Sequence, residues 1–202
     1  MRPPSMPLDR MLAACGIVGV VGFVAAWAIG GRLVDGYSGI DDAISQLAAV
    51  DSSARALMSA GFVAFGIGVP LFAQALRTAL GGPAWIAATV TGLATLGVAV
   101  TPLGRFDAAH YVFAAGGYAS LAATPLLAAV TLRRRGATRR ANLSIACGAV
   151  SAALLAASTL DPVHGLTQRL GLGVTDAWIV ATAVVIIRQT RRPTGGHVTQ
   201  TA

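Results

Sequence analysis

The 202-residue chain is too apolar for an ordinary soluble domain, since hydrophobic residues make up 55% of it, charged residues 11%, and its mean hydropathy is +0.69. All fifteen cations are arginine and all eight anions are aspartate, which excludes reactions that demand a glutamate. The net charge of +7 is common among nucleic-acid-binding proteins, but here the arginines lie between long apolar runs, as in a membrane protein.

Six apolar runs follow one another along the chain. Each is long enough to cross a hydrocarbon core of about 30 Å at a rise of about 1.5 Å per residue. The sequence therefore predicts an all-α integral membrane bundle of six transmembrane helices, with the bilayer as its first partner. The predicted spans are residues 11–31, 56–76, 82–103, 110–132, 141–160 and 170–188. Residues 1–192 then form one membrane domain, and the polar residues 193–202 are expected to be a disordered tail.

The connection between the first two spans is the longest. Within it, Ile40, Ile44 and Leu47 recur at helical spacing, which predicts a short amphipathic helix that lies at the interface or folds back over the mouth of the bundle. Ser38 followed by Asp41 resembles a capping box with aspartate in the place of glutamate. A plain solvent-exposed loop is the alternative.

The arginines predict the orientation of the bundle. With both termini in the cytoplasm, eleven arginines lie inside and four lie outside, which is the asymmetry that the positive-inside rule requires. The RRRGATRR segment at residues 133–140 supplies most of this difference, and it also has the charge to attract anionic lipid headgroups. We expect a multi-pass protein of the plasma membrane.

Glycines on the first two spans predict close helix contacts, because helices in lipid associate through small residues. In span one they are Gly16, Gly19 and Gly22, and in span two they are Gly61, Gly66 and Gly68.

The candidate functional residues gather at the outer end of the predicted bundle. Those residues are Ser45, Asp107, His110, His164 and Arg169. Asp176 lies about two turns inside the sixth span, where an ionisable group costs up to about 2.5–3.5 kcal/mol unless it is paired. Asp176 is therefore a candidate ligand or proton site, with Arg105, His110 and Arg169 as possible partners. The alternative is a polar clasp that pins the fourth and sixth spans together.

Other chemistry at this end has weaker support. Asp107, His110 and His164 are suitable ligands for zinc or iron, but no metal-binding spacing accompanies them, so we expect no metal and no cofactor. Haem ligation by His110 and His164, or nucleophilic catalysis by Ser45, would need side chains that only folding could bring together.

Five stretches of the chain carry a resemblance to a known family. They are Gly36-Tyr37-Ser38, Ile44-Ser45-Gln46-Leu47, the small-residue-rich second span (AGFVAFGIGVPLFAQAL), Gly97–Pro102 with Asp107 and His110 soon after it, and Gly165–Leu170. Together they resemble the bacterial domain-of-unknown-function 998 family from about Val34 to Arg188. The resemblance implies a multi-span helical architecture and places Ser45, Asp107, His110 and Arg169 at family motif positions, but it transfers no reaction. Gln46 stands where an acidic residue often follows the Ile-Ser pair, so no carboxylate role is implied there.

Taken together, these features predict a non-enzymatic membrane protein whose outer polar cluster binds a small ligand, a lipid headgroup or a partner, such as another membrane protein or a second copy of the chain. The alternative is a membrane-embedded enzyme or a proton-coupled transporter that uses Asp107, His110 and Asp176. The sequence leaves open whether the cluster forms a pocket or a structural clasp.

Overall fold

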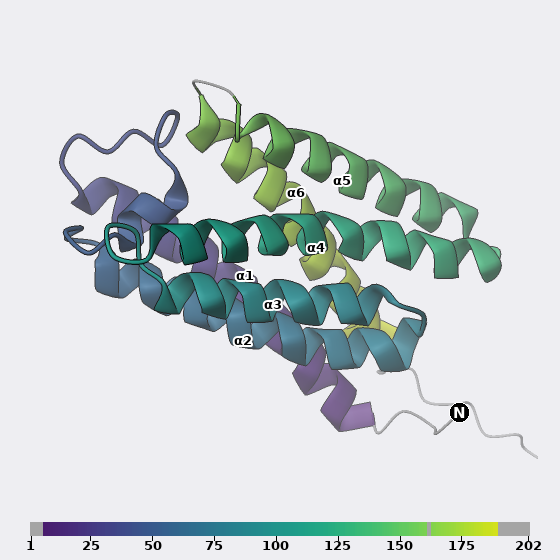
Figure 1. Ribbon diagram of the computed structural model, residues 1–202. Coiled ribbons are helices and arrows are strands. Elements are labelled where there is room, and N and C mark those ends of the chain that lie inside the picture. The colour runs from purple at the N-terminus through teal and green to yellow at the C-terminus, as the bar shows by residue number, and fades with distance from the viewer. Residues whose placement is uncertain (1–5, 161–162, 190–202) are drawn as a thin grey trace, which may run out of the picture.

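The computed structural model describes residues 6–160 and 163–189, and the predicted tail lies outside them. Within these ranges the chain forms six α-helices and one short 3-10 helix, with no strand (Figure 1). The elements are α1 (Met6–Leu33), η1 (Ile44–Ala48), α2 (Arg55–Leu80), α3 (Ala84–Val100), α4 (Asp107–Arg134), α5 (Thr138–Ala157) and α6 (His164–Gln189). The predicted all-α bundle is confirmed.

The helices are those of a multi-pass membrane protein. Five of them, α1, α2, α4, α5 and α6, are long and apolar enough to cross a membrane. Helix α3 is also apolar but has only 17 residues, about 25 Å at the usual rise. Large apolar side chains face outward along the bundle, among them Val18 (67% exposed) and Val112 (71% exposed). Outward faces of this kind suit lipid rather than water.

Consecutive helices pack against each other as neighbours, and α6 returns to contact α1 (Figure 1). One end of the bundle, which we call the terminal end, carries the start of α1, the end of α6 and the turns at 81–83 and 135–137. The opposite end, which we call the far end, carries the 34–54 segment, the turn at 101–106 and the start of α6. The described arginines divide between these ends, eight at the terminal end and four at the far end.

Glycines set the spacing between the first three helices, whereas the sequence predicts such contacts from glycines on the first two spans. A Cβ atom on Gly68 would lie 2.5 Å from the backbone oxygen of Cys15, so α1 and α2 are in backbone contact there. A Cβ on Gly92 of α3 would lie 2.2 Å from Cδ of Pro70 on α2. These contacts bring α1, α2 and α3 together at distances that larger side chains would prevent.

The 34–54 segment folds back over the far end instead of forming an exposed loop. Its only regular piece is η1, a five-residue 3-10 helix. Ile44 and Leu47 are buried beneath it, but Ile40 is 53% exposed, so the predicted apolar stripe is shorter than expected. The physical reason is that the chain turns between Ile40 and Ile44 and does not hold one helical phase through both.

The predicted capping box in this segment forms, but Asp42 rather than Asp41 accepts its second hydrogen bond. The Ser38 hydroxyl oxygen accepts the N–H of Asp41 at 3.2 Å, as predicted. The reciprocal bond, however, runs from the Ser38 N–H to the Asp42 carboxylate at 2.7 Å. Asp41 instead accepts the Ser38 hydroxyl at 2.6 Å. The two carboxylates together fix this turn.

Candidate functional site

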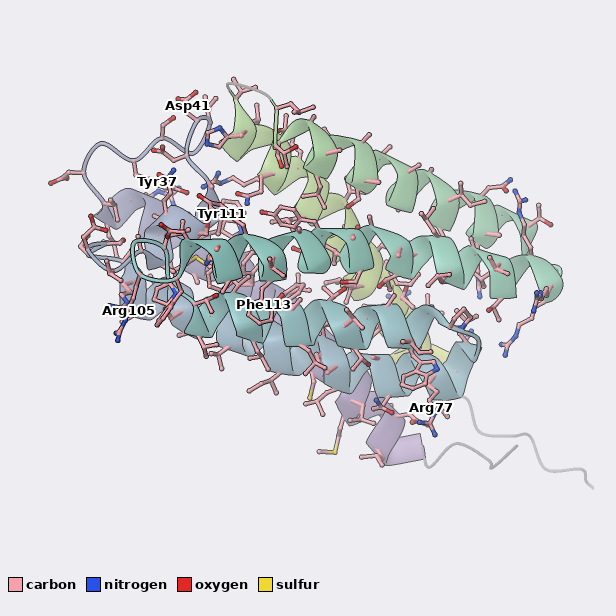
Figure 2. All side chains as sticks on the ribbon, viewed as in Figure 1. Tyr37, Asp41, Arg77, Arg105, Tyr111 and Phe113 are labelled. Carbon is pink, nitrogen blue, oxygen red and sulfur yellow. The ribbon has the colours of Figure 1, made fainter. Side chains whose placement is uncertain are left out.

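The far end brings most of the predicted site residues to one region of the bundle. Ser45 lies in η1, Asp107 and His110 open α4, and His164 and Arg169 lie in the first two turns of α6. The sequence placed the last two in a linker, but the helix begins six residues before the apolar run does. Figure 2 shows Arg105 at this end and Arg77 at the opposite one.

Arg169 ties the 34–54 segment to α6. Its guanidinium donates to the backbone carbonyls of Asp42 at 2.9 Å and Gly165 at 2.8 Å, and to the hydroxyl of Tyr37. The same group lies over the rings of Trp27, 5.4 Å from the centroid, and Tyr37, 5.5 Å from the centroid. We call Arg169, Tyr37, Asp42 and Trp27 the latch. Because these contacts occupy Arg169, its charge serves to hold the segment in place.

The phenol of Tyr37 completes the latch. Its hydroxyl donates to the carbonyl of Ala43 at 3.1 Å while it accepts from Arg169. Burial raises the pKa of Tyr37 above its ordinary value of 10.0, and the nearby Arg169 cation opposes that shift. The hydroxyl therefore keeps its proton at neutral pH and makes both hydrogen bonds.

Gln168 makes a second connection, between α6, α4 and η1. Its side-chain amide donates to the hydroxyl of Tyr118 on α4, and its carbonyl accepts the N–H of Ile44 at 2.8 Å. Gln168 is only 6% exposed, so both bonds are shielded from water. Gln168 and Tyr118 therefore connect α6 to α4 by a polar contact, whereas the clasp that the sequence predicts between these spans is one made by Asp176.

His110 is held in one orientation by the backbone. The ring is 2% exposed, and its Nδ1 lies 2.7 Å from the carbonyl oxygen of Thr101. Since a carbonyl can only accept, Nδ1 carries the proton of this bond, and Nε2 is the ring nitrogen left to bond another group.

These groups surround a cavity of about 60 Å³ below η1, which we call the far chamber. Six polar side chains line it: Ser45, Thr91, Thr95, His110, Tyr118 and Gln168. The hydroxyls of Thr91 and Thr95 donate to backbone carbonyls of their own helix, at 3.0 and 2.9 Å. Aromatic and aliphatic side chains form the rest of the wall, including Phe23, Phe62, Phe65, Phe113, Leu121 and Leu172. No lining residue, all of which lie in the described part of the chain, is charged. The chamber thus offers hydrogen bonds on an apolar surface without an ion.

Asp107 and His164 lie outside this chamber. Asp107 is exposed, and its carboxylate accepts the N–H of Gly104 at 2.7 Å, which closes the turn before α4. His164 is half-buried at the first turn of α6. Within residues 6–160 and 163–189, no three histidine, cysteine or acidic side chains come together as a metal site needs.

Asp176 is buried in α6, 4% exposed. In the described part of the chain its Oδ1 has no hydrogen-bond partner, and neither does the hydroxyl of the adjacent Thr175. Arg169 and His110, two of the predicted partners, are engaged in the bonds given above, so the predicted clasp through Oδ1 is not formed. Asp176 does not line the far chamber.

Sequence reasoning did not select Tyr37, Tyr118, Gln168 or Trp27 as site residues. Two of them were within reach, because Tyr37 and Gln168 stand inside the motifs Gly36–Ser38 and Gly165–Leu170. Tyr118 lies two turns after His110 on α4, at a spacing that places both on one face. No pattern in the sequence pointed to Trp27.

The fold and the site define a multi-pass helical membrane protein with a small internal chamber at one end, closed by a latched segment. The chain belongs to the family described as "Protein of unknown function (DUF998)", whose model matches residues 17–185. The resemblance seen in the short motifs is thus confirmed, and the match includes the latch, the chamber and Asp176. No curated protein and no solved structure matches the chain.

Proposed function

We propose that this protein binds a small, uncharged, hydroxyl-bearing ligand in the far chamber. The observation that supports the proposal is the lining, where Ser45, His110, Tyr118 and Gln168 converge on a mainly apolar cavity whose two threonine hydroxyls, of Thr91 and Thr95, already donate to backbone carbonyls. Binding sites for small molecules combine an apolar wall with a few polar groups in this way. A ligand hydroxyl would donate to Nε2 of His110 and accept from a neighbouring side chain.

The size and charge of the chamber restrict the ligand. Its volume of about 60 Å³ is well below the roughly 150 Å³ of a cavity that holds benzene, so it takes a group of only a few heavy atoms. No cation lines the wall to pair with a carboxylate or phosphate, and an unpaired buried charge is costly. A neutral alcohol, or the alcohol end of a longer molecule, is the class that fits.

Fluorine NMR of trifluoroethanol with the purified protein tests this proposal. We expect saturable line broadening with a dissociation constant of about 1 mM, the scale for a ligand of so few heavy atoms. Gly117 lines the chamber, and a Cβ there meets only Ala94 at 3.7 Å, so Gly117→Leu should fill the space and abolish the broadening.

Gly116→Leu is the matched control, because Gly116 is exposed one residue earlier on α4 with nothing within 4 Å of its Cβ position. It should leave the broadening unchanged, and trifluoroacetate should show none. Equal loss in both variants, or equal binding of the charged analogue, would refute the proposal.

We also propose that the far end faces outside the plasma membrane and that both termini are cytoplasmic. The arginines support this orientation, since the end with eight of the twelve described arginines should be the cytoplasmic one. The orientation requires α3 to serve as the sixth crossing of a single membrane domain. Its 17 residues reach the lower limit for a spanning helix, and it lies beside α2 and α4 in the bundle (Figure 1).

A further inference from the structure

A second and larger cavity opens at the terminal end of the bundle, remote from the far chamber. It has a volume of about 360 Å³ and lies between the ends of α2, α4 and α6 and the start of α5. We call it the terminal crevice. Leu76, Leu132 and Leu143 contribute to its apolar wall, and Trp178 lies at its deep end. Arg135 and Arg140 line the same cavity near the helix ends.

The two arginines are available to bind an anion. Arg135 follows the last residue of α4 and donates from Nη1 to the carbonyl of Ala79 near the end of α2, at 3.1 Å. This bond holds the guanidinium across the gap between α4 and α2, and it uses only one of its five N–H donors. Arg140 is exposed in the first turn of α5. In the described part of the chain, neither arginine forms an ion pair, and no aspartate lines the crevice.

The depth of the crevice matches one leaflet of a bilayer. On α6 its lining runs from Trp178 to Gln189, eleven residues apart, which is about 16 Å along a helix. That length is about half of a 30 Å hydrocarbon core. The arginines therefore stand at the level of lipid headgroups while the apolar wall reaches toward the middle of the membrane.

We propose that the terminal crevice binds one anionic phospholipid, with its phosphate between Arg135 and Arg140 and an acyl chain along the wall that ends at Trp178. The charge of the rim selects the headgroup, and the apolar length selects a lipid over a free phosphate ion. This site is independent of the ligand proposed for the far chamber.

Trp178 provides a reporter inside the crevice. Its indole N–H donates to the hydroxyl of Ser144 at 2.9 Å, so the ring has a fixed position. The other tryptophans, Trp27 and Trp85, can be replaced by phenylalanine, which leaves Trp178 as the only emitter. The protein is then placed in phosphatidylcholine vesicles that contain a small fraction of either phosphatidylglycerol or phosphatidylcholine with brominated acyl chains, which quench tryptophan on contact.

We expect half-maximal quenching at about a tenfold lower fraction of the brominated anionic lipid than of the brominated neutral lipid. The difference is expected because two arginines near the membrane surface attract the anionic headgroup. Arg135→Gln with Arg140→Gln should remove this preference. Arg134→Gln with Arg139→Gln is the matched control, because it removes the same charge from the same segment at two exposed residues that do not line the crevice. The control should keep the tenfold preference.

A second pair of variants tests the crevice without changing its charge. Ala181 lines the crevice and Ala177 does not, although both are exposed on α6 one turn apart. Ala181→Phe should raise the half-quenching fraction of the anionic lipid several-fold, and Ala177→Phe should not. This pair decides the matter if the double arginine variant fails to fold. Equal quenching by both lipids, equal loss in the two arginine pairs, or removal of the preference by millimolar inorganic phosphate would overturn the proposal.

Discussion

Arg169 holds together parts of the chain that are far apart in sequence. Its partners Tyr37 and Asp42 precede it by 132 and 127 residues. A guanidinium can satisfy several acceptors at once because its donors are fixed in a plane. Lysine carries the same charge but acts as a point donor on a flexible chain. The geometry of the latch, rather than its charge alone, should therefore hold the 34–54 segment over the chamber.

The first prediction concerns this geometry. In Arg169→Lys, amide hydrogen exchange across residues 37–48 should become about ten to a hundred times faster, since charge-assisted hydrogen bonds contribute about 1.5–3 kcal/mol. Mass spectrometry of the exchanged protein in detergent measures this directly. Exchange in α3, which holds no latch residue and packs against α2 and α4, should stay unchanged.

Arg32→Gln provides the control for charge at the same end of the bundle. Arg32 is exposed and donates only to the carbonyl of Ala28 in its own helix, at 2.8 Å. Its replacement should leave exchange in the 34–54 segment as it is in the native protein. If Arg169→Lys behaves like Arg32→Gln, the other contacts of the segment, such as the Gln168–Ile44 bond, hold it in place and the latch has no role.

Residue types and their end of the bundle were predictable, but their partners were not. Arginines, histidines and aspartates between apolar runs could be assigned to one end because a helix crosses the membrane in a known number of residues. The sequence offers Arg105, His110 and Arg169 as possible partners of Asp176, whereas its Oδ1 has no hydrogen-bond partner in the described chain. The bonds Gln168–Tyr118 and Gln168–Ile44 depend on how α4, α6 and η1 pack, and no local spacing encodes that packing.

Pairs of helices in this bundle approach each other where glycines face one another. At the crossing of α1 and α2, Gly19 and Gly68 are so close that a Cβ on Gly68 would lie 2.9 Å from the Cα of Gly19. Elsewhere glycines are exposed to lipid, and Gly173 on α6 has nothing within 4 Å of its Cβ position. The same residue type thus serves packing in one place and not in the other.

Alanine substitution separates these two roles. Gly68→Ala should lower the free energy of unfolding by about 1–3 kcal/mol, because a rigid backbone oxygen occupies the space of the new methyl group. Gly173→Ala should leave stability unchanged or raise it slightly, since alanine favours a helix over glycine. Thermal unfolding in detergent, followed by circular dichroism, gives both values. Similar losses in the two variants would contradict this account of the α1–α2 contact.

Helix number and order were predictable from hydropathy, and helix ends were less so. The apolar run of the sixth span starts at residue 170, but α6 begins at His164 because its first polar turn is held by the latch and packs against the 34–54 segment. Gly165 shows how closely, since a Cβ there would lie 2.4 Å from the backbone oxygen of Asp42. Hydropathy cannot detect a polar turn that is helical because of contacts made elsewhere in the chain.

At the scale of the whole molecule, the two proposed sites require opposite faces of the membrane. The far chamber lies at the end with four described arginines, and the terminal crevice lies at the end with eight. Membrane insertion places the arginine-rich end in the cytoplasm. The ligand would therefore reach its chamber from outside, and the anionic lipid would come from the inner leaflet.

Cysteine labelling of intact cells tests this arrangement. In a background with Cys15 and Cys147 replaced by alanine, Asp51→Cys at the far end should react with a membrane-impermeant maleimide. Thr138→Cys at the terminal end should react only after the cells are permeabilised. Both positions are exposed, so differences in reactivity report the side of the membrane. Labelling of both from the same side would rule out the six-crossing arrangement.

The return of α6 to α1 has a consequence for biogenesis. Early helices can pack against their neighbours as they leave the translocon. The chamber wall, however, includes Gln168 and Leu172 of the last helix, and the latch requires Arg169 of the same helix. A chain arrested after α5 would have five helices packed in sequence, but its 34–54 segment would lack the contacts that Arg169 and Gln168 make. We expect the far chamber to be incomplete in such intermediates, so that only the chain with α6 in place can bind the ligand.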